Sequence, residues 1–467
     1  MVQSILLSLL LVCIYNVHGS NTCCNPAAPL DTEKRCLGKV GGYDEVLAHA
    51  RYKNYGSDTR TSNRFGQALS MNQNYLVVGS PNVDSNRGAV YVFRKGSRNR
   101  WEEIQKIEAP NGTLHFGESV SICDDESRFV VGDSRAHGNI GRVLVYELMQ
   151  GVPSFKHTQT LTLSNGRTGT RFGNDVAIYK DTIVVGAFGK RDQENKITGA
   201  AYLFKNVAPN DEYTMHAELS KCVSHKAHFG TSVSIHRNAI VIGAPGYNSG
   251  QGIAFIYSTW STKLRKTIKG STPTSNLGAT VRTFGRHVVV AESGLYNSSG
   301  AVRVYRYNNR MWDGPELLRS PDGDEFDVFG KSIAIKNRKL VVGAYYAGGE
   351  GACSGSAYFY EEMDCACKQF KFRSRLKKTD GEARDYFGIS SAISWDTITI
   401  GASGDDDYGS HAGRIDTFSA RDLVRLYPQR QLEEASCTKS QPDVEVDAED
   451  DDSNMPPSVE DSPLPNK

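Results

Sequence analysis

Short stretches of alternating hydrophobic and polar residues, separated by turns, run through most of the chain. Residues 64–71 alternate, and after a turn at 72–74 a continuous apolar run follows at 75–78. Residues 89–93 alternate again, and residues 101–107 form a fourth, more polar segment. Such alternation and short apolar runs are typical of β-strands, and the Gly, Pro and Asn residues between them favour turns. The pattern predicts four short strands.

This four-strand unit occurs seven times. Each unit opens with Phe-Gly or, once, Leu-Gly, at Phe65, Phe116, Phe172, Phe229, Leu277, Phe329 and Phe387, so that successive units start 51, 56, 57, 48, 52 and 58 residues apart. Four strands in a repeat of about 40–50 residues or slightly more are typical of a propeller blade. A row of small β-sandwiches is the alternative, but seven near-equal units without linkers favour a closed ring. We predict an all-β fold over residues 44–432, a seven-bladed β-propeller of four-stranded antiparallel blades.

The polarity of the strands fits this arrangement. The second strand of each unit is the most apolar, as expected for a strand buried between neighbouring blades, and the fourth is rich in Lys, Glu and Thr, as expected for an outer edge. The Phe of each Phe-Gly pair is expected to wedge between adjacent blades.

The units resemble FG-GAP repeats, which build the N-terminal propeller of integrin alpha subunits. The resemblance covers about residues 60–420. It implies a seven-bladed ring in which a distant segment supplies the outer strand of blade seven. Either Glu45 to Tyr52 or Arg421 to Tyr427 could be that segment, and the sequence does not choose between them.

The two ends of the chain differ from the repeats. Residues 1–19 contain an apolar run and small residues near position 19, a pattern that predicts a signal peptide. Residues 20–43 form a Cys-containing lead-in, and residues 433–467 form an acidic, Pro-containing tail that we expect to be disordered. The net charge of +1 hides nine acidic residues between 441 and 467. We therefore expect a secreted, extracellular protein with no membrane span and no nucleic-acid partner, glycosylated at Asn111 and Asn297.

Nine cysteines follow the predicted signal peptide, as expected for disulfides in an oxidising compartment, and the odd number leaves one that is free or intermolecular. A bridge between the lead-in (Cys23, Cys24 or Cys36) and Cys437 would reinforce ring closure. Cys353 precedes the third strand of blade six, whereas Cys365 and Cys367 follow it. We expect about 20 Å of strand to separate them, so that Cys353 bridges neither of them and Cys365 and Cys367 join separate disulfides.

Function on a propeller is carried by the loops of one face. In antiparallel blades the loops from strand two to strand three share a face with the connections to the next blade, and we call this the loop face. Aromatic residues recur in these loops, and tyrosine is a favoured contact residue at interfaces. We predict a partner-binding rim in which six aromatics stand side by side, at Phe188, Tyr247, Tyr296, Tyr345, Tyr346 and Tyr408. The alternative is that each ring merely packs over its own loop.

Metal and catalytic sites are less well supported. The calcium loop that the resemblance implies, Asp-x-Asp-x-Asp-Gly between strands one and two, is absent here, and no cofactor is expected. One acidic cluster, at Asp405, Asp406 and Asp407, has oxygen ligands suited to Ca²⁺, but three consecutive carboxylates favour a solvated turn. His225 and His228 are interpreted as loop polar residues rather than zinc ligands. No nucleophile with a base and no paired-carboxylate site stands out.

We therefore predict a non-catalytic protein that binds an extracellular protein or glycan through the loop face. Two alternatives stay open from the sequence. One is a structural component of an extracellular coat or matrix that uses the acidic tail, and the other is a carbohydrate-active enzyme with its site at the centre of the ring.

Overall fold

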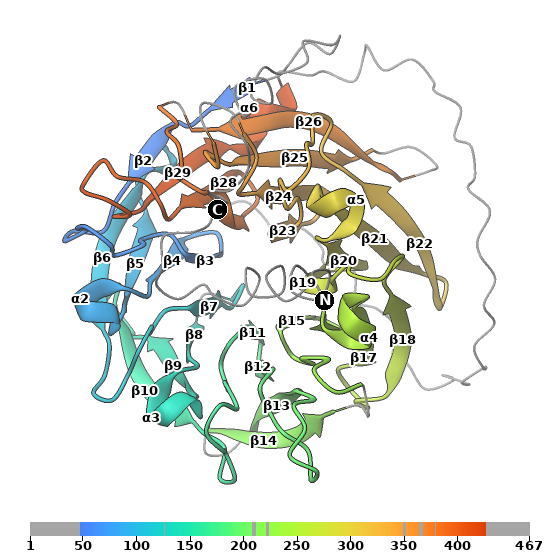
Figure 1. Ribbon diagram of the computed structural model, residues 1–467. Coiled ribbons are helices and arrows are strands. Elements are labelled where there is room, and N and C mark those ends of the chain that lie inside the picture. The colour runs from blue at the N-terminus through green and yellow to red at the C-terminus, as the bar shows by residue number, and fades with distance from the viewer. Residues whose placement is uncertain are drawn as a thin grey trace, which may run out of the picture. The chain divides into compact units, whose positions relative to one another are not determined.

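The computed structural model describes residues 47–425, apart from positions 126, 208–211, 221–223, 349–351, 364–367 and 379. Within these residues the strands form seven sheets arranged in a ring (Figure 1). Neighbouring strands within each repeat are antiparallel and follow chain order from the centre outwards. The predicted all-β, seven-bladed propeller is confirmed.

The strands of the first four blades are four to eight residues long. Blade one consists of β3 (Ala68–Met71), β4 (Tyr75–Ser80), β5 (Ala89–Lys95) and β6 (Trp101–Glu108). Blade two consists of β7 (Ser119–Ile122), β8 (Arg128–Asp133), β9 (Arg142–Leu148) and β10 (Phe155–Leu161). Blade three consists of β11 (Val176–Tyr179), β12 (Thr182–Ala187), β13 (Ala200–Val207) and β14 (Glu212–Leu219). Blade four consists of β15 (Ser232–His236), β16 (Ala239–Ala244), β17 (Ile253–Ser258) and β18 (Leu264–Lys269).

The last three blades repeat this order. Blade five consists of β19 (Leu277–Phe284), β20 (His287–Glu292), β21 (Ala301–Asn308) and β22 (Met311–Leu318). Blade six consists of β23 (Ser332–Lys336), β24 (Lys339–Ala344), β25 (Ser356–Glu362) and β26 (Phe370–Lys377). Blade seven takes only three strands from its own repeat, β27 (Phe387–Ile393), β28 (Thr397–Ala402) and β29 (Arg414–Ser419).

Burial follows the predicted polarity of the strands. Every residue of β4, β16 and β28, the second strands of their blades, is buried. Along β10, an outer strand, only the two end residues are buried. Apolar second strands thus pack between neighbouring sheets, and polar fourth strands face solvent.

The opening Phe of each repeat locks its blade to the preceding one. Its backbone bridges to the glycine before the third strand of that blade, and Gly413 of blade seven bridges to Phe65 of blade one, which completes the ring. All seven opening Phe or Leu side chains are fully buried, so the predicted wedge is confirmed. Gly88 shows why glycine is needed, because φ is 93° and a Cβ would lie 2.2 Å from the carbonyl oxygen of Phe116.

The chain closes the ring at its N-terminal side. β2 (Tyr52–Asn54) pairs antiparallel with β29 and supplies the outer strand of blade seven. β1 (Leu47–His49) lies parallel to β26 and adds a fifth strand to blade six. Of the two predicted segments, the N-terminal one is therefore on the correct side, but only Tyr52 of Glu45 to Tyr52 lies in the outer strand of blade seven, and residues 47–49 belong to blade six instead. The C-terminal alternative is wrong, because residues there form α6 (Ala420–Arg425), which buries Ala420 and Leu423 on one side as a helix does.

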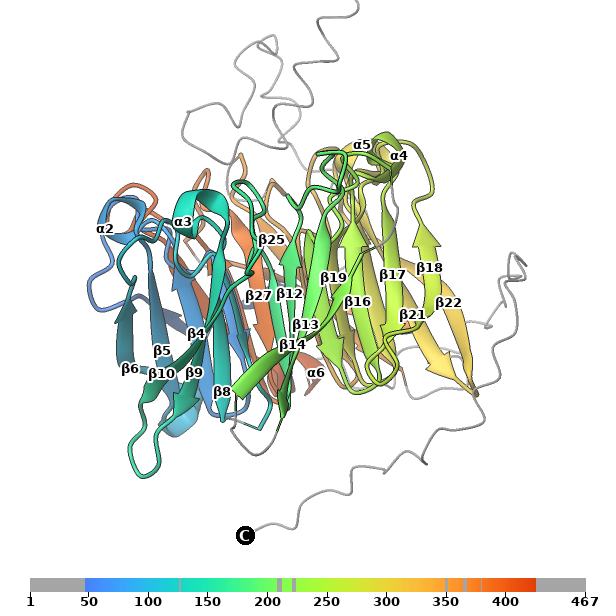
Figure 2. The same ribbon diagram turned by 90° about the horizontal axis from the view of Figure 1, so that it is seen from below.

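The loops from strand two to strand three lie together along one edge of the ring, as Figure 2 shows for α2 (Val83–Asn86), α3 (Ala136–Asn139), α4 (Tyr247–Gly250) and α5 (Leu295–Ser298). Each of these short elements contains three residues with positive φ, so they are tight turns rather than regular helices. Blades three, six and seven have longer loops, at 188–199, 345–355 and 403–413. Among the described residues, no helix is both long and apolar enough to cross a lipid bilayer.

Candidate functional site

The residue before each opening Phe or Leu has the same unusual backbone in all seven blades. Its φ lies between 52° and 64°, a region that non-glycine residues seldom adopt. The amide of Tyr386, for example, donates a hydrogen bond to the carbonyl of Cys353 in the preceding blade at 3.2 Å. The repeat thus presents one side chain at each junction between blades on the loop face. We call these the seam positions: Arg64, His115, Arg171, His228, Asn276, Val328 and Tyr386.

Three tyrosines meet at the seam between blades six and seven. Tyr345 and Tyr346 follow β24, and their ring centroids are 3.8 Å apart. The Tyr386 ring lies 6.1 Å from Tyr345 and 6.0 Å from Tyr346, in each case between centroids. All three side chains are half-buried, so each keeps part of its surface exposed. We call this group the tyrosine cluster.

Basic side chains border the tyrosine cluster. The Lys331 ammonium lies 5.6 Å from the centroid of the Tyr345 ring, and the His411 ring lies 6.5 Å from that of Tyr386. Partial burial lowers the pKa of His411, and the positive charges of Arg64 and Arg384 lower it further. The lowered pKa favours the neutral imidazole of His411, so the positive charge at the edge of the cluster comes from Lys331, Arg64 and Arg384.

The other four predicted aromatics lie apart from this cluster. Phe188 contacts the His228 ring in the next blade, with centroids 5.7 Å apart, and Tyr247 is half-buried against the core of blades three and four. Tyr296 is 44% exposed, with the Arg319 guanidinium 3.6 Å from its ring centroid. Tyr408 is 59% exposed and its ring lies 4.5 Å from that of Tyr55. Among the ring contacts of the described residues, only Tyr345 and Tyr346 of the predicted six touch each other.

Sequence reasoning missed three aromatics of this face. Tyr386 completes the tyrosine cluster, Tyr55 packs on Tyr408, and Phe326 is 59% exposed in the connection before blade six. The signal for Tyr386 was present in the repeat, because it occupies the seam position directly before Phe387. Tyr386 lies outside the loops between strands two and three, where the binding aromatics were predicted.

The acidic cluster of blade seven differs from the solvated turn that was predicted. Asp406 and Asp407 are exposed, but Asp405 is completely buried. Its carboxylate pairs with Lys378 and lies 3.4 Å from the guanidinium of Arg414, both of which are buried. These cations come from the end of β26 and the start of β29, so the turn folds inward to meet them. Asp407 also contacts the Arg414 guanidinium, at 3.1 Å, so two of the three carboxylates meet at a cation of the protein itself.

Arg414 and Lys378 connect this turn to a larger ionic network. Arg414 also pairs with Asp416 at 3.0 Å and with Asp380 at 2.9 Å, and Asp380 pairs in turn with Lys53 of the closing strand β2. Burial raises the pKa of Asp416 to about 6 although Arg414 opposes this shift. The network ties blade seven to the segment that closes the ring.

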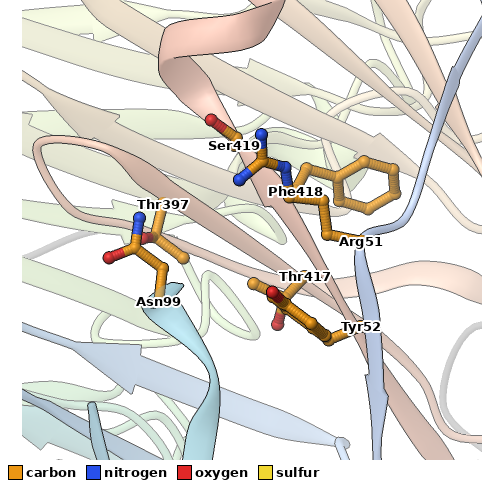
Figure 3. Close-up of a pocket in the computed structure, with 7 residues that line it drawn as sticks. All are labelled: Arg51, Tyr52, Asn99, Thr397, Thr417, Phe418 and Ser419. Carbon is orange, nitrogen blue, oxygen red and sulfur yellow. The ribbon is translucent and has the colours of Figure 1, made fainter. Parts of the chain in front are cut away.

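The seam behind the closing strand contains a narrow crevice. Arg51, Tyr52, Thr417, Phe418 and Ser419 line it, together with Asn99 and Thr397 (Figure 3). The Arg51 amide donates to the carbonyl of Thr417 at 2.7 Å, and the crevice has no volume open to a water molecule. It is a packing seam with no space for a ligand.

The predicted glycosylation sites both lie on the loop face. Asn111 is exposed in the connection between blades one and two, and Asn297 is exposed in the turn α5. The Asn297 amide donates to Glu325 at 2.9 Å. Glycosylation itself stays a prediction.

Several sequence predictions concern cysteines outside the described residues. Cys23, Cys24, Cys36, Cys365, Cys367 and Cys437 all lie there, so the proposed bridges stay predictions. Cys353 lies in the loop before β25, and Cys123 is a buried free thiol whose pKa burial raises to about 12.

Histidines and carboxylates provide no metal centre in the part of the chain that the structure describes. No group of three or more His, Cys, Asp or Glu residues there could hold a metal ion. His228 packs against Phe188, and burial lowers the pKa of its ring, whereas His225 is exposed.

Comparison with known families gives a match to the FG-GAP repeat in four segments, at residues 55–93, 155–204, 312–360 and 370–415. These segments lie in blades one, two, three, five, six and seven of the ring. Together with the seven blades and their Phe-Gly bridges, they support an FG-GAP propeller that resembles the N-terminal domain of integrin alpha subunits.

Proposed function

We propose that this protein is a secreted, non-catalytic binding protein that recognises an extracellular protein or glycan through the tyrosine cluster of its loop face. The FG-GAP propeller fold is consistent with a binding role. The observation that supports this particular surface is the contact of Tyr345, Tyr346 and Tyr386 across the seam between two blades.

Tyrosines at this seam suit recognition for physical reasons. Each offers a large apolar ring and a hydroxyl group and has few rotatable bonds, so ordering it on binding costs little entropy. Tyr and Arg are also enriched among the residues that dominate interface energetics. Arg64, Arg384 and Lys331 add positive charge at the edge, where it can steer an anionic partner towards the cluster.

Backbone hydrogen bonds hold the loop that carries the cluster. The Ala347 amide donates to the carbonyl of Ala344 at 3.1 Å, and the Gly355 amide donates to the carbonyl of Ala347 at 2.9 Å. Ala347 itself is buried. A surface fixed before binding loses less conformational entropy when a partner docks.

The test compares capture of partners by purified wild-type protein and by the double variant Tyr345→Ala, Tyr346→Ala from an extracellular-matrix extract, quantified by mass spectrometry. We expect at least a tenfold loss for the main partner, equal to about 1.4 kcal/mol. Trp260→Ala is the matched control, because this side chain is 73% exposed in the turn between β17 and β18, on the opposite face.

Thermal unfolding of each variant separates a binding defect from a folding defect. Equal capture by the folded double variant and the wild type would remove the tyrosine cluster as the binding site. Loss of capture on deletion of residues 441–467 alone would instead favour a matrix component that acts through its acidic tail.

A further inference from the structure

A cleft of about 560 Å³ lies on the loop face beside blade three, away from the tyrosine cluster. One wall is the connection from β10 to β11, which carries Arg167, and the other is the loop from β12 to β13, which carries Lys190, Arg191 and Gln193. Its volume falls in the range of about 300–1,000 Å³ that is usual for small-ligand sites.

The loop from β12 to β13 is built as a small hairpin. Arg191 and Ile197 form an antiparallel bridge. The Asp192 amide donates to the carbonyl of Lys196 at 2.9 Å, and the Lys196 amide donates to the Asp192 carboxylate at 2.8 Å. The turns α2, α3, α4 and α5 contain no such bridge among the described residues. The hairpin therefore gives the cleft a wall that is fixed before any ligand arrives.

The two walls are also held against each other at their base. The Gly189 amide donates to the carbonyl of Thr170 at 3.2 Å. A Cβ on Gly189 would lie 1.9 Å from the carbonyl oxygen of Gly169, so only glycine permits this close approach.

A buried ring and an ion pair form the floor of the cleft. Lys190 pairs with Glu218, and its ammonium lies 5.7 Å from the centroid of the Tyr202 ring. Burial raises the pKa of Tyr202, and the Glu218 carboxylate raises it further, so this hydroxyl stays protonated. The charges of Lys190 and Glu218 offset each other.

Positive charge remains on both walls. Arg167 and Arg191 are exposed, and neither guanidinium pairs with a carboxylate in the described part of the chain. Arg191 donates to the carbonyl of Asn195 at 2.9 Å, within the hairpin. Asp192 is engaged in capping its own turn, so two arginines face the cleft with no acidic group dedicated to them.

We propose that this cleft is a second ligand site, separate from the tyrosine cluster, that binds an anionic saccharide carrying a carboxylate or a sulfate. The two arginines would hold the anionic group, since guanidinium forks pair well with planar and tetrahedral oxyanions. Gln193 and the hydroxyl side chains of the lining can both donate and accept, as sugar hydroxyls require. Leu163 offers apolar surface to the C–H face of a sugar ring.

A saccharide fits the cleft better than an acidic peptide. Extended peptides are usually held by a sheet edge or by a series of side-chain pockets. The cleft instead lies between two loops, and most of the residues that line it carry amide, hydroxyl or charged side chains.

The test is isothermal titration calorimetry on the full mature chain with three tetrasaccharides: a sulfated heparin fragment, oligogalacturonate and uncharged maltotetraose. We expect at least one anionic tetrasaccharide to bind at least tenfold more tightly than maltotetraose. The double variant Arg167→Ala, Arg191→Ala should weaken that binding at least tenfold. Lys196→Ala, an exposed lysine at the hairpin tip that pairs with Glu194, is the matched control and should change it less than twofold.

Three results would overturn the proposal. They are no binding of either anionic tetrasaccharide, wild-type affinity in the folded double arginine variant, or loss of binding in Tyr345→Ala, Tyr346→Ala, which would move the site to the tyrosine cluster. A peptide of residues 441–452 that binds the cleft more tightly than both saccharides would assign it to the chain's own acidic segment and would also overturn it.

Discussion

The loops of blades three and six show how one repeat can present two different surfaces. Both connect the second strand to the third, and both are longer than the eight-residue loops of blades one, two, four and five. In blade three the extra residues pair with one another and stand up as a hairpin beside a polar cleft. In blade six they place Tyr345 and Tyr346 against Tyr386 of the next blade.

The frame beneath these loops, meaning the strands and the bridges between blades, is the same in blades three and six. In both cases a glycine before the third strand bridges to the opening Phe of the next blade, Gly199 to Phe229 and Gly355 to Phe387. The frame therefore sets where each loop emerges. The length and the residues of the loop decide which chemical groups it presents. Changes to the frame should therefore lower stability, and changes to the loop surfaces should alter binding alone.

The largest effect is expected at Arg414, where the frame of blade seven depends on a buried cation. Arg414→Met should lower the free energy of unfolding by about 3–5 kcal/mol, because it leaves Asp416 buried without its ion-pair partner and leaves Asp405 paired with Lys378 alone. Chemical denaturation monitored by tryptophan fluorescence measures the change. Arg51→Met is the control, since Arg51 pairs with Asp422 at the surface, where such pairs contribute about 0–1 kcal/mol. Equal losses in the two variants would show that burial of the network does not matter.

The second-largest loss of stability is expected at Gly88, where two blades are in close contact. Gly88 and Gly112 both have positive φ, at 93° and 77°, so alanine strains the backbone at either position. Only at Gly88 would the new Cβ also collide with Phe116, since nothing lies within 4 Å of a Cβ at Gly112. We expect Gly88→Ala to cost about 3 kcal/mol of stability and Gly112→Ala about 1 kcal/mol. Similar losses in denaturant unfolding would contradict the close packing of blades.

A smaller, pH-dependent effect is expected beneath the loop of blade six. Burial, together with the nearby charges of Asp324 and Asp322, raises the pKa of Asp327 to about 6. The folded state therefore binds this proton more tightly than the unfolded chain. The contribution of this proton to stability is present below about pH 4. As the pH rises through 6, the free energy of unfolding falls by up to about 3 kcal/mol.

The variant Asp327→Asn tests this sign, because the amide is neutral at every pH. Relative to the wild type, its free energy of unfolding should increase between pH 4 and pH 7. Parallel curves for the two proteins over that range would show that Asp327 ionises equally well in the folded and unfolded states.

The repeat in the sequence was sufficient to predict the blades, because strand alternation and the Phe-Gly spacing are local properties. The placement of Asp405 could not be predicted in this way. Three consecutive aspartates suggest a solvated turn, and only folding brings Lys378 and Arg414 against the first of them. The segment that closes the ring was also ambiguous, because a strand that pairs with a distant segment carries no repeat in its own sequence that identifies its partner.

The candidate site was predicted in part. The aromatic residues of the loops could be identified, but their grouping depends on which neighbours each seam supplies. Tyr345 and Tyr346 meet another tyrosine, whereas Phe188 meets His228 and Tyr408 meets Tyr55. Seam residues become visible only when the position before each Phe-Gly pair is compared across the repeats.

Site-specific photocrosslinking tests the central claim about the tyrosine cluster most directly. Benzoylphenylalanine is placed at Tyr346 in one protein and at Trp395 in another, because Trp395 is 58% exposed in the turn between β27 and β28, on the opposite face. After irradiation with an extracellular-matrix extract, we predict a discrete crosslinked species from position 346 and none of that mass from position 395. A discrete species from position 395 alone would contradict the account and place recognition on the other face of the ring.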